Sequence, residues 1–439
     1  MATYKNLRKV LNLPTLSASP SSGVNGEMYF NTGDSALYIY DGAWKKVTQS
    51  ELPGPDWTVA AQQAKIEASD AQTGDEFGYS IDISSDTVVA GAWYEDTGGS
   101  NAGAAYVFTR SGTSWSQQAK LVASNAGAGD QFGYSVAIDG DTIVAGANNE
   151  DTGAQDTGSA YVFTRSGTTW SQQAKLVASD AQAGDYLGWS VGISGDTIVV
   201  GAFGEDTGGS YAGAAYVFTR SGTTWSQQAK LVASDAQAND YLGRGEIGIS
   251  GDTIVVGAYR EDAGGSDAGA AYVFIRSGTS WSQQAKLVAS DAQANDQFGR
   301  AVSISSDTVV VGASLEDAGG TDTGAVYVFT RSGTSWSQQA KLVAENPSEL
   351  DEFGISVDID GDSVIMGATK EDTGSQDTGA VYIFTRSGTT WSQQKLLKAS
   401  DVPADKRFGW AAAIDGKTAV GTSKLIDSNT GAAYTFLAG

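Results

Sequence analysis

The chain has 439 residues, 51 of them acidic and 27 basic, a formal net charge of −24, and neither histidine nor cysteine. This composition excludes disulfides and thiol chemistry, removes the usual ligands of zinc and copper, and removes histidine as a general base. The negative charge argues against a nucleic-acid partner and an anionic membrane surface, and no segment is apolar enough for membrane insertion.

Residues 1–55 form a separate segment. Lys5–Leu13 is predicted to be a short amphipathic helix that ends at Pro14, and residues 16–25 are rich in Ser, Pro and Gly, which is typical of a linker. The start lacks the continuous apolar core of a secretory signal. Met28–Ile39 alternates around the turn Asn31–Ser35, which predicts a β-hairpin. Because a lone hairpin is marginal in water, it should dock on the rest of the chain, on another copy in a homo-oligomer, or on a partner.

The hairpin phrase resembles a short module of structural proteins of tailed phages, especially fibre and fibre-associated proteins. The matching residues are Gly26, Tyr29, Asn31, Thr32, Leu37, Tyr40, Asp41, Gly42 and Trp44. The resemblance implies a virion component that is assembled in the host cytoplasm and displayed outside the cell. Residues 1–55 would then attach it to other virion proteins, and the expected assembly residues are Tyr29, Phe30, Leu37, Tyr38, Tyr40 and Trp44.

From residue 56 onward the chain repeats one unit about every 55 residues. Three landmarks keep step through seven copies. A tryptophan opens the phrase W-S-Q-Q-A-K-L at Trp57 (where the phrase is divergent), Trp115, Trp170, Trp225, Trp281, Trp336 and Trp391. Phe-Gly or Leu-Gly follows about twenty residues later, and Gly-Ala (Gly-Thr in the last copy) follows about fourteen residues after that. Three markers in step identify a repeat protein built from one copied supersecondary unit.

Each copy contains four strand-like runs. In the third copy they are Trp189–Ser194, Asp196–Ala202, Ala214–Arg220 and Trp225–Ala233, separated by glycine-containing turns. Residues 225–232 alternate with a period of two, and the second run is apolar on both faces, as expected of a sheet between neighbours. We expect Gly-Ala to lie where strands crowd toward an axis.

Seven units of four antiparallel strands predict an all-β fold, a seven-bladed β-propeller over residues 56–439. A linear solenoid is the structural alternative. The first fourth-strand phrase, Trp57–Ile66, has no earlier strands of its own, whereas the last copy supplies only three strands, ending at Ala432–Leu437. The early strand 57–66 would complete the last blade and close the ring, which removes exposed sheet edges.

The phrases Phe-Gly-Tyr-Ser-Val, Gly-Ala and Ala-Ala-Tyr-Val-Phe resemble the FG-GAP repeat, known from the head of integrin α chains and from bacterial surface proteins. The resemblance covers about residues 57–439 and implies a seven-bladed propeller with a role in binding. Such repeats often carry a calcium loop of the form D-x-D-x-D-G. No copy here has that loop, so calcium binding does not carry over.

One face of the ring should carry the loops between strands two and three together with the loops that join successive blades. Acidic pairs recur there, which predicts a strongly acidic face. Turn shaping is one interpretation, a Ca²⁺ site is a second, and glycosidase carboxylates are a third. The pairs are Glu95-Asp96, Glu150-Asp151, Glu205-Asp206, Glu261-Asp262, Glu316-Asp317 and Glu371-Asp372. The opposite face should be mixed, with six arginines whose stems cover apolar surface and whose heads pair with acids.

Positions where the copies differ are the candidate ligand-binding residues, because variable side chains on a fixed scaffold build a binding surface. Drift on an unselected surface is the alternative. The candidates are Trp93, Tyr94, Asn148, Asn149, Phe203, Tyr211, Tyr259, Arg260 and Lys370, with Ser314, Leu315 and Thr369 at equivalent positions.

Three functions are therefore open. The first is a phage virion protein, a fibre, tail or capsid-decorating component whose propeller binds a host-surface glycan or protein for attachment. The second is a bacterial surface adhesin. The third is a polysaccharide-degrading enzyme, which the absence of histidine and the sameness of the blades disfavour; the expectation is a protein without catalytic residues and without a cofactor.

Overall fold

The computed structural model describes residues 15–16, 28–31, 36–40, 43–46, 54–317, 319–372 and 376–439. The chain divides into two compact units, Met1–Pro55 and Asp56–Gly439. None of the described helices has the length and apolar character that crossing a membrane requires.

The first unit contains one four-stranded sheet with the order β1-β2-β3-β4. Its strands are β1 (Thr15–Leu16), β2 (Met28–Asn31), β3 (Ala36–Tyr40) and β4 (Trp44–Lys46). The predicted hairpin is β2–β3, in which Tyr29 pairs with Tyr38 and Phe30 with Leu37. Two further strands extend it, since β4 pairs with β3 through Tyr40 and Trp44 and β1 lies parallel to β2. The hairpin is therefore part of a sheet rather than alone. The predicted helix Lys5–Leu13 and most of the predicted linker lie outside the described residues.

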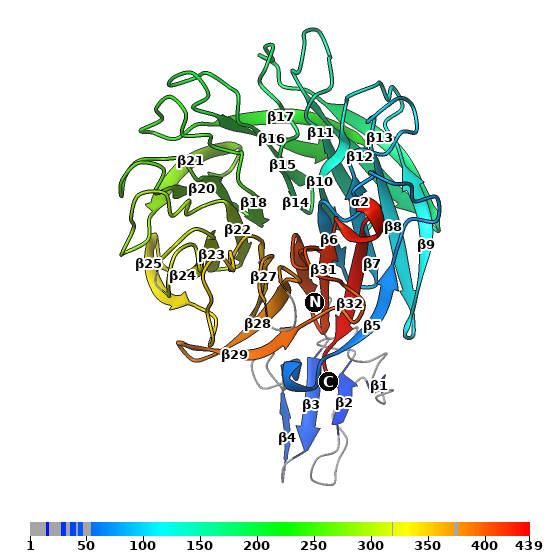
Figure 1. The fold of residues 1–439 in the computed structure, drawn as a ribbon, viewed down its shortest axis with the longest axis vertical. Helices are drawn as coiled ribbons and strands as arrows, with labels where there is room; N and C mark the ends of the chain where they lie inside the picture. Colours follow the sequence, from blue (N-terminus) through cyan, green and yellow to red (C-terminus); the bar gives the residue numbers. More distant parts are fainter. Residues whose placement is uncertain are drawn as a thin grey trace. The chain divides into compact units, whose positions relative to one another are not determined.

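The second unit is a seven-bladed β-propeller of four-stranded antiparallel sheets (Figure 1). The innermost strands are β6 (Ile81–Ser84), β10 (Phe132–Asp139), β14 (Val191–Ser194), β18 (Ile247–Ser250), β22 (Ala301–Ser305), β26 (Val357–Asp360) and β30 (Ala412–Asp415). The second strands are β7 (Thr87–Ala92), β11 (Thr142–Ala147), β15 (Thr197–Ala202), β19 (Thr253–Ala258), β23 (Thr308–Ala313), β27 (Ser363–Ala368) and β31 (Thr418–Ser423). The third strands are β8 (Ala104–Ser111), β12 (Ser159–Ser166), β16 (Ala214–Ser221), β20 (Ala270–Ser277), β24 (Ala325–Ser332), β28 (Ala380–Ser387) and β32 (Ala432–Leu437). The outer strands are β9 (Ser114–Leu121), β13 (Thr169–Leu176), β17 (Thr224–Leu231), β21 (Ser280–Leu287), β25 (Ser335–Leu342), β29 (Thr390–Leu397) and β5 (Ala61–Ile66).

The ring is closed by an early strand, as the sequence predicts. β5 pairs antiparallel with β32, with Ile66 opposite Ala433 and Lys65 opposite Tyr434, so the blue strand lies beside the red one in Figure 1. The predicted strand 57–66 is too long, however. Trp57–Val59 is a 3-10 helix (η2), because the Asp56 side chain caps it by accepting a hydrogen bond from the Thr58 N–H.

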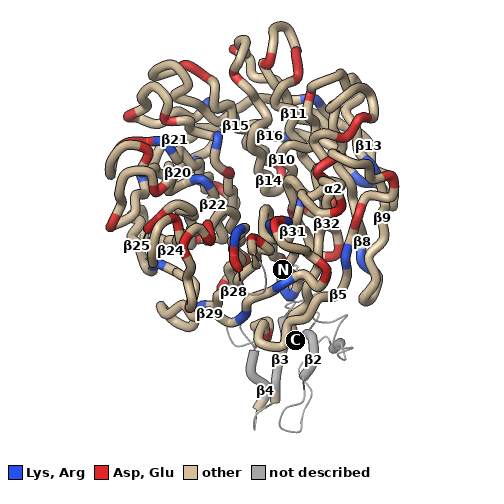
Figure 2. Tube along the Cα trace, viewed as in Figure 1, with Lys and Arg blue, Asp and Glu red and all other residues tan. Residues whose placement is uncertain are grey.

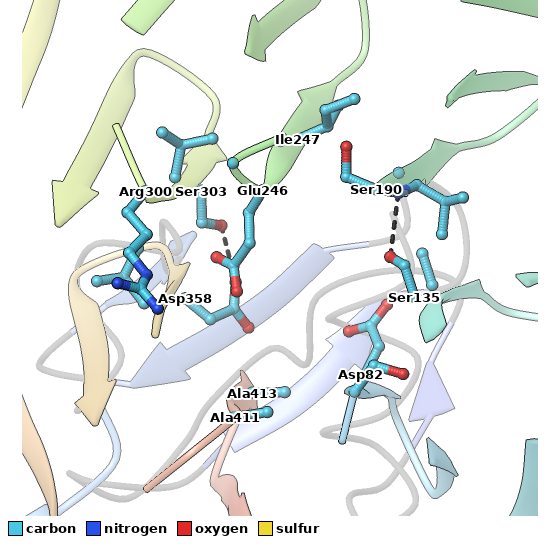
Figure 3. Close-up of a pocket in the computed structure, with 18 of the residues that line it drawn as sticks. Asp82, Ser135, Ser190, Glu246, Ile247, Arg300, Ser303, Asp358, Ala411 and Ala413 are labelled. Atoms are coloured by element: carbon cyan, nitrogen blue, oxygen red, sulfur yellow. Dashed lines mark hydrogen bonds between the residues drawn. The ribbon is translucent and has the colours of Figure 1, made fainter. Parts of the chain in front are cut away.

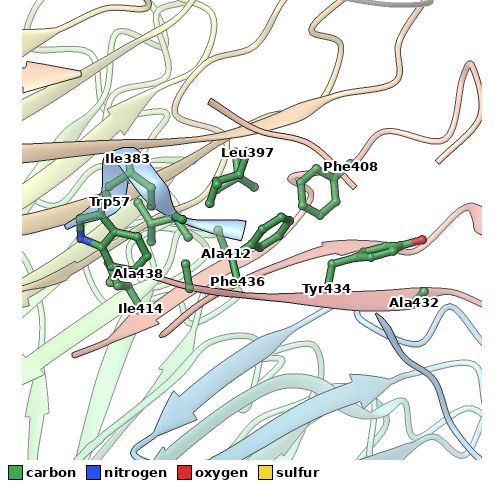
Figure 4. Close-up of a cluster of buried hydrophobic side chains, with 14 of the residues drawn as sticks. Trp57, Ile383, Leu397, Phe408, Ala412, Ile414, Ala432, Tyr434, Phe436 and Ala438 are labelled. Carbon is green, nitrogen blue, oxygen red and sulfur yellow. The ribbon is translucent and has the colours of Figure 1, made fainter. Parts of the chain in front are cut away.

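Each hydrophobic core lies between two neighbouring blades. The cluster around Trp57 joins blades six and seven, and it includes Ile383 and Leu397 from blade six and Phe436 from blade seven (Figure 4). The second strands are buried along their whole length, for example β15. A single blade could not bury two apolar faces, so each copy provides the surface that covers the next.

The Gly-Ala landmark marks crowding between blades rather than crowding toward the axis, which corrects the expectation. A Cβ on Gly201 would lie 2.3 Å from the carbonyl oxygen of Gly243 in the next blade, and a Cβ on Gly257 would lie 1.8 Å from that of Gly299. Glycine is required at these positions because the neighbouring backbone occupies the space of a side chain.

The six repeated arginines join strands and blades at the opposite face. Arg110 lies 2.7 Å from Asp86, packs over the Trp115 ring with its Cζ 5.4 Å from the centroid, and donates to Thr418 of blade seven. The predicted mode, a stem on apolar surface with a paired head, is confirmed in this contact set.

Candidate ligand site at the mouth of the axial channel

The seven innermost strands surround an axial cavity of about 660 Å³, lined by residues of every blade. Backbone and small side chains such as Ala137, Gly192 and Ala413 form much of its wall. At one end the chain enters each innermost strand through the Phe/Leu-Gly landmark, and the loop after Gly-Ala lies beside it. The two sets of loops share this face as predicted, since the Phe132 N–H donates to the Ala102 carbonyl oxygen at 2.8 Å.

Three positions in every blade gather at this end, and we call these residues the mouth. The first precedes the Phe/Leu-Gly landmark: Glu76, Gln131, Tyr186, Tyr241, Gln297, Glu352 and Arg407. The second follows the landmark: Tyr79, Tyr134, Trp189, Arg244, Arg300, Ile355 and Trp410. The third follows Gly-Ala, or in the last blade Thr422-Ser423, which take the register of Gly-Ala in the strand pairing although the sequence suggests Gly421-Thr422. Its residues are Trp93, Asn148, Phe203, Tyr259, Ser314, Thr369 and Lys424. These positions differ from copy to copy, as do some positions between them, for example the one occupied by Asp82, Gly192 and Asp358.

Local backbone geometry presents the first two positions. All seven residues of the first position adopt positive φ, for example +56° at Tyr186 and +59° at Tyr241, and the glycine of the landmark does so as well. These positive φ angles interrupt the extended backbone in blade three, so β14 begins at Val191 and Trp189 lies outside it. The predicted strand Trp189–Ser194 is therefore two residues too long, and the difference places an aromatic ring at the mouth. An ordered non-glycine residue at positive φ stores strain, which is often found at functional sites.

Mouth residues of one blade contact one another. In blade one, Trp93 donates to Glu76 at 3.1 Å and packs against Tyr79 with ring centroids 4.8 Å apart. In blade three, Phe203 stacks on Tyr186 at 5.0 Å and meets Trp189 edge-on at 4.5 Å.

The rings also form a continuous arc from blade to blade. Trp410 of blade seven lies 5.8 Å from Tyr79, whose hydroxyl is 2.9 Å from that of Tyr134. Tyr134 lies 4.5 Å from Trp189, and the Arg244 guanidinium is 5.3 Å from the Trp189 ring. We call these five residues the aromatic arc. Each is half-buried, so the arc offers partly exposed ring surface over blades seven, one, two and three, and the Arg244 guanidinium of blade four at its end.

Two kinds of arginine occur among the described residues. Six repeated arginines are ion-paired with aspartates on the opposite face. The other described arginines are Arg244, Arg260, Arg300 and Arg407, and within the described part of the chain none of these four has a carboxylate within ion-pairing distance. Arg244 instead lies over rings, 4.8 Å from Tyr241 and 5.0 Å from Phe203.

Three carboxyl groups lie deeper in the channel (Figure 3). Asp82 and Asp358 accept hydrogen bonds of 2.7 and 2.8 Å from the Ile138 and Ile414 N–H groups of the next blade. Burial and, next, the nearby Asp358 charge raise the pKa of Asp82 and of Glu246 to about 8; burial raises the pKa of Asp358 to about 6. Glu246 is exposed to the channel, but protein surrounds the channel and solvates the carboxylate poorly.

The sequence analysis identified part of this site. Trp93, Tyr94, Tyr259 and Arg260 are half-buried at or beside the mouth, and Tyr94 stacks on Trp93 at 3.7 Å. Tyr211 is exposed and lies 6.1 Å from Phe203.

Other predicted candidates lie deeper or are already bonded. Asn148 and Phe203 are only 1% and 7% exposed, so they support the mouth from beneath rather than present a surface. Asn149 accepts from Asn148 at 2.9 Å. Thr369 and Ser314 are buried, Leu315 is half-buried, and Lys370 is ion-paired with Glu352 at 2.8 Å.

The acidic pairs have structural contacts in every blade that carries them. Glu205 accepts from the Thr207 N–H at 2.8 Å and pairs with Lys230 of the outer strand at 2.6 Å. Glu95, Glu150, Glu261 and Glu316 each pair with an outer-strand lysine in the same way, and Glu371 pairs with Lys398, just beyond β29. These glutamates are buried and paired with lysines, whereas the aspartates beside them are exposed; Lys and Arg are interspersed with Asp and Glu along the chain (Figure 2).

The aspartates of the pairs shape their loops. Asp206 accepts from the Tyr211 N–H at 2.9 Å, five residues on. The same bond is made by Asp96, Asp151, Asp262, Asp317 and Asp372. Within the described residues no group of three or more acidic side chains is arranged to hold a metal ion. Turn shaping accounts for these contacts, and calcium binding stays a prediction.

The model of the FG-GAP repeat matches the chain seven times, at residues 60–108, 115–163, 170–218, 225–274, 281–329, 336–384 and 391–436. These matches span most of the chain, which therefore belongs to the FG-GAP repeat family. No curated protein matches it. The class defined by fold and site is thus a closed FG-GAP propeller with a differentiated mouth on one end of its axial channel.

Proposed function

We propose that this propeller is a binding module that takes a cell-surface ligand at the mouth. The observation that carries the proposal is the placement of variable residues: three positions that differ among the seven blades lie together at one end of the channel, and residues such as Trp410, Tyr134 and Arg244 line its cavity. A repeat that served architecture alone would have no reason to gather aromatic and cationic side chains there.

The proposal includes a role in attaching a phage particle to its host cell. The propeller would be displayed outward to bind a host-surface glycan or protein, and residues 1–55 would join it to other virion proteins. The support is the phage-like phrase of residues 26–44 and the separation of residues 1–55 as a compact unit.

The binding role is tested with the full chain on an array of bacterial surface polysaccharides and purified surface proteins. Tyr134→Ala with Trp410→Ala should lower affinity at least tenfold, whereas Arg220→Gln at the opposite face should not. Unfolding temperature shows whether each variant is folded. Equal binding by the mouth variant, or no binding to any component, would contradict the proposal. Shortening of a bound polysaccharide would instead support the enzyme hypothesis.

The virion role has a separate test, because a propeller can bind ligands wherever it is carried. Antibody to the propeller should label particles in electron micrographs, and particles assembled with a chain lacking residues 1–55 should lose the label. Unlabelled particles would leave the surface adhesin as the better hypothesis.

A further inference from the structure

The mouth combines arginines that have no ion-pair partner with the aromatic arc, and its binding role does not explain this combination by itself. In a chain of net charge −24, arginines without ion-pair partners among the described residues gather at one place. Arg244, Arg260 and Arg300 line the axial cavity, in blades four and five, next to the end of the aromatic arc. Among the other described arginines of the blades, the six repeated ones each have an aspartate, and Arg407 of blade seven does not.

We propose that Arg244, Arg260 and Arg300 bind the carboxylate of an acidic saccharide whose pyranose ring packs on the aromatic arc. This inference rests on the proposed binding role of the mouth. A guanidinium presents paired N–H donors that match the two oxygens of a carboxylate, and it is weakly hydrated, so it exchanges water for an anion at small cost.

The arginines are prepared for such a ligand. Four aromatic rings hold Arg244, including Tyr259 at 5.7 Å from its Cζ, and this stacking fixes the plane of the guanidinium. Arg300 donates only to Gln297, at 3.1 Å, among the described residues. The Nε of Arg260 is buried with no hydrogen-bond partner there. Donors held in position without acceptors lose less conformational entropy when an anion arrives.

The neighbouring aromatic rings favour a saccharide over an acidic peptide. A pyranose has one face of C–H groups that packs on a ring and a rim of hydroxyls that needs polar partners. The mouth offers both, since it contains the rings of Tyr134 and Trp189 together with polar side chains such as Gln131. Aromatic platforms with a few placed polar groups are the usual construction of such a pocket.

The acids deeper in the channel do not cancel the cationic sector. Asp82 and Glu246 have pKa values of about 8, so both are largely neutral at pH 7. Each is also turned toward the backbone: Asp82 accepts from the Ile83 N–H at 2.7 Å and from the next blade. Asp358, with a pKa of about 6, is largely ionised at pH 7. An anion at the mouth therefore meets three arginine charges and this one opposing carboxylate beneath them.

The test uses calorimetric titration of the full chain at pH 7 with two matched pairs of probes. One pair is trigalacturonic acid and its methyl ester, and the other is sialyllactose and lactose. The acidic member of at least one pair should bind at least tenfold more tightly than its neutral partner, and the stronger pair distinguishes a uronate from a sialate ligand. Arg300→Gln and Arg260→Gln should each remove most of that preference, whereas Arg220→Gln should retain it. If one of these variants is poorly folded, Arg300→Lys takes its place; it keeps the charge and should retain part of the preference for the acidic probe.

The outcomes separate the two proposals. Equal affinity for acidic and neutral probes, with both lost in Trp410→Ala, would overturn the acidic ligand and leave the binding mouth intact. Binding that survives both arginine and tryptophan substitutions would overturn both. No binding to any probe would overturn the acidic saccharide, and the array would then decide the binding role alone. Equal affinity for tri-glutamate would overturn the saccharide assignment.

Discussion

The backbone N–H of Ile138 donates a 2.7 Å hydrogen bond to the carboxyl group of Asp82 in the preceding blade. The innermost strand of a blade has one unpaired edge, which faces the channel, and its N–H groups need acceptors. Asp358 serves Ile414 in the same way two blades away around the ring. These acids therefore join neighbouring blades at the centre of the ring. Because they lie where water solvates them poorly, the stability of the fold should depend on pH.

The first prediction concerns Glu246, Asp82 and Asp358. Because burial raises their pKa values to about 8, 8 and 6, the folded chain keeps protons that the unfolded chain has released above its ordinary carboxyl pKa. Stability falls with pH wherever the folded state binds more protons. We expect the unfolding temperature to fall between pH 5 and pH 9, and Glu246→Gln to flatten that decline.

An exposed acid supplies the control for this titration. Glu345→Gln should leave the slope between pH 5 and pH 9 unchanged. The range excludes the region below pH 4, where protonation of aspartates such as Asp235 makes the protein less stable as pH falls, which is the opposite dependence. Burial would raise the pKa of Asp235, but hydrogen bonds from Lys286 and Tyr272 hold it below its ordinary value. Parallel curves for Glu246→Gln and the unaltered chain would show that this carboxyl is ionised in the folded state.

The second prediction concerns Lys230, which bonds to Glu205 and to Asp180 at 2.8 Å. Lys230→Leu leaves a carboxylate that is 4% exposed without its ammonium partner, at a cost of about 2–4 kcal/mol. Blade six shows how the loss can be compensated: Leu396 stands at the lysine position, and Lys398 reaches Glu371 at 3.2 Å. Adding Val232→Lys to Lys230→Leu should recover part of the loss in urea unfolding. A double variant no more stable than the single one would show that a lysine at position 232 cannot replace Lys230 in the way that Lys398 serves Glu371.

The third prediction concerns divalent cations. The carboxylate of each repeated glutamate pairs with a lysine, and each neighbouring aspartate accepts a backbone N–H, for example Asp206 from Tyr211. A cation would have to displace these bonds. We expect millimolar Ca²⁺ and EDTA to shift the unfolding temperature by less than about 1 °C. A clear rise with Ca²⁺ that Asp206→Asn reduces would favour the cation-site interpretation of the acidic pairs.

The fold could be predicted from the sequence because three landmarks repeat in step, and because an early strand and three late strands complement each other. The mouth could be predicted only in part. Residues after Gly-Ala stand out as variable, but Tyr79 and Tyr134 look like constant residues of the repeated Phe-Gly-Tyr-Ser phrase. Comparison of that column across the seven copies, where Arg244 and Trp410 replace them, was the signal that would have found the aromatic arc.

Two other features depend on three-dimensional pairing. Glu205 and Lys230 are 25 residues apart, and only the pairing of β16 with β17 brings them together. Glu246 lies in the one copy whose tryptophan spacing is 56 instead of 55. That extra residue was visible in the sequence, but its placement in the channel follows from the late start of β18.

The last prediction concerns closure of the ring. Trp57 is 1% exposed, packs in the cluster between blades six and seven, and donates from Nε1 to Ser363 of blade six at 3.1 Å. Trp57→Ala should therefore destabilise the propeller by about 3–5 kcal/mol, since it leaves a large cavity where β5 joins the last blade. Val59 in the same 3-10 helix is 60% exposed, so Val59→Ala is a matched control with a change of less than about 0.5 kcal/mol. Limited proteolysis should release the β5 region first in Trp57→Ala, because loss of this anchor exposes the edge of β32. Cleavage that begins at another blade would show that closure does not depend on Trp57.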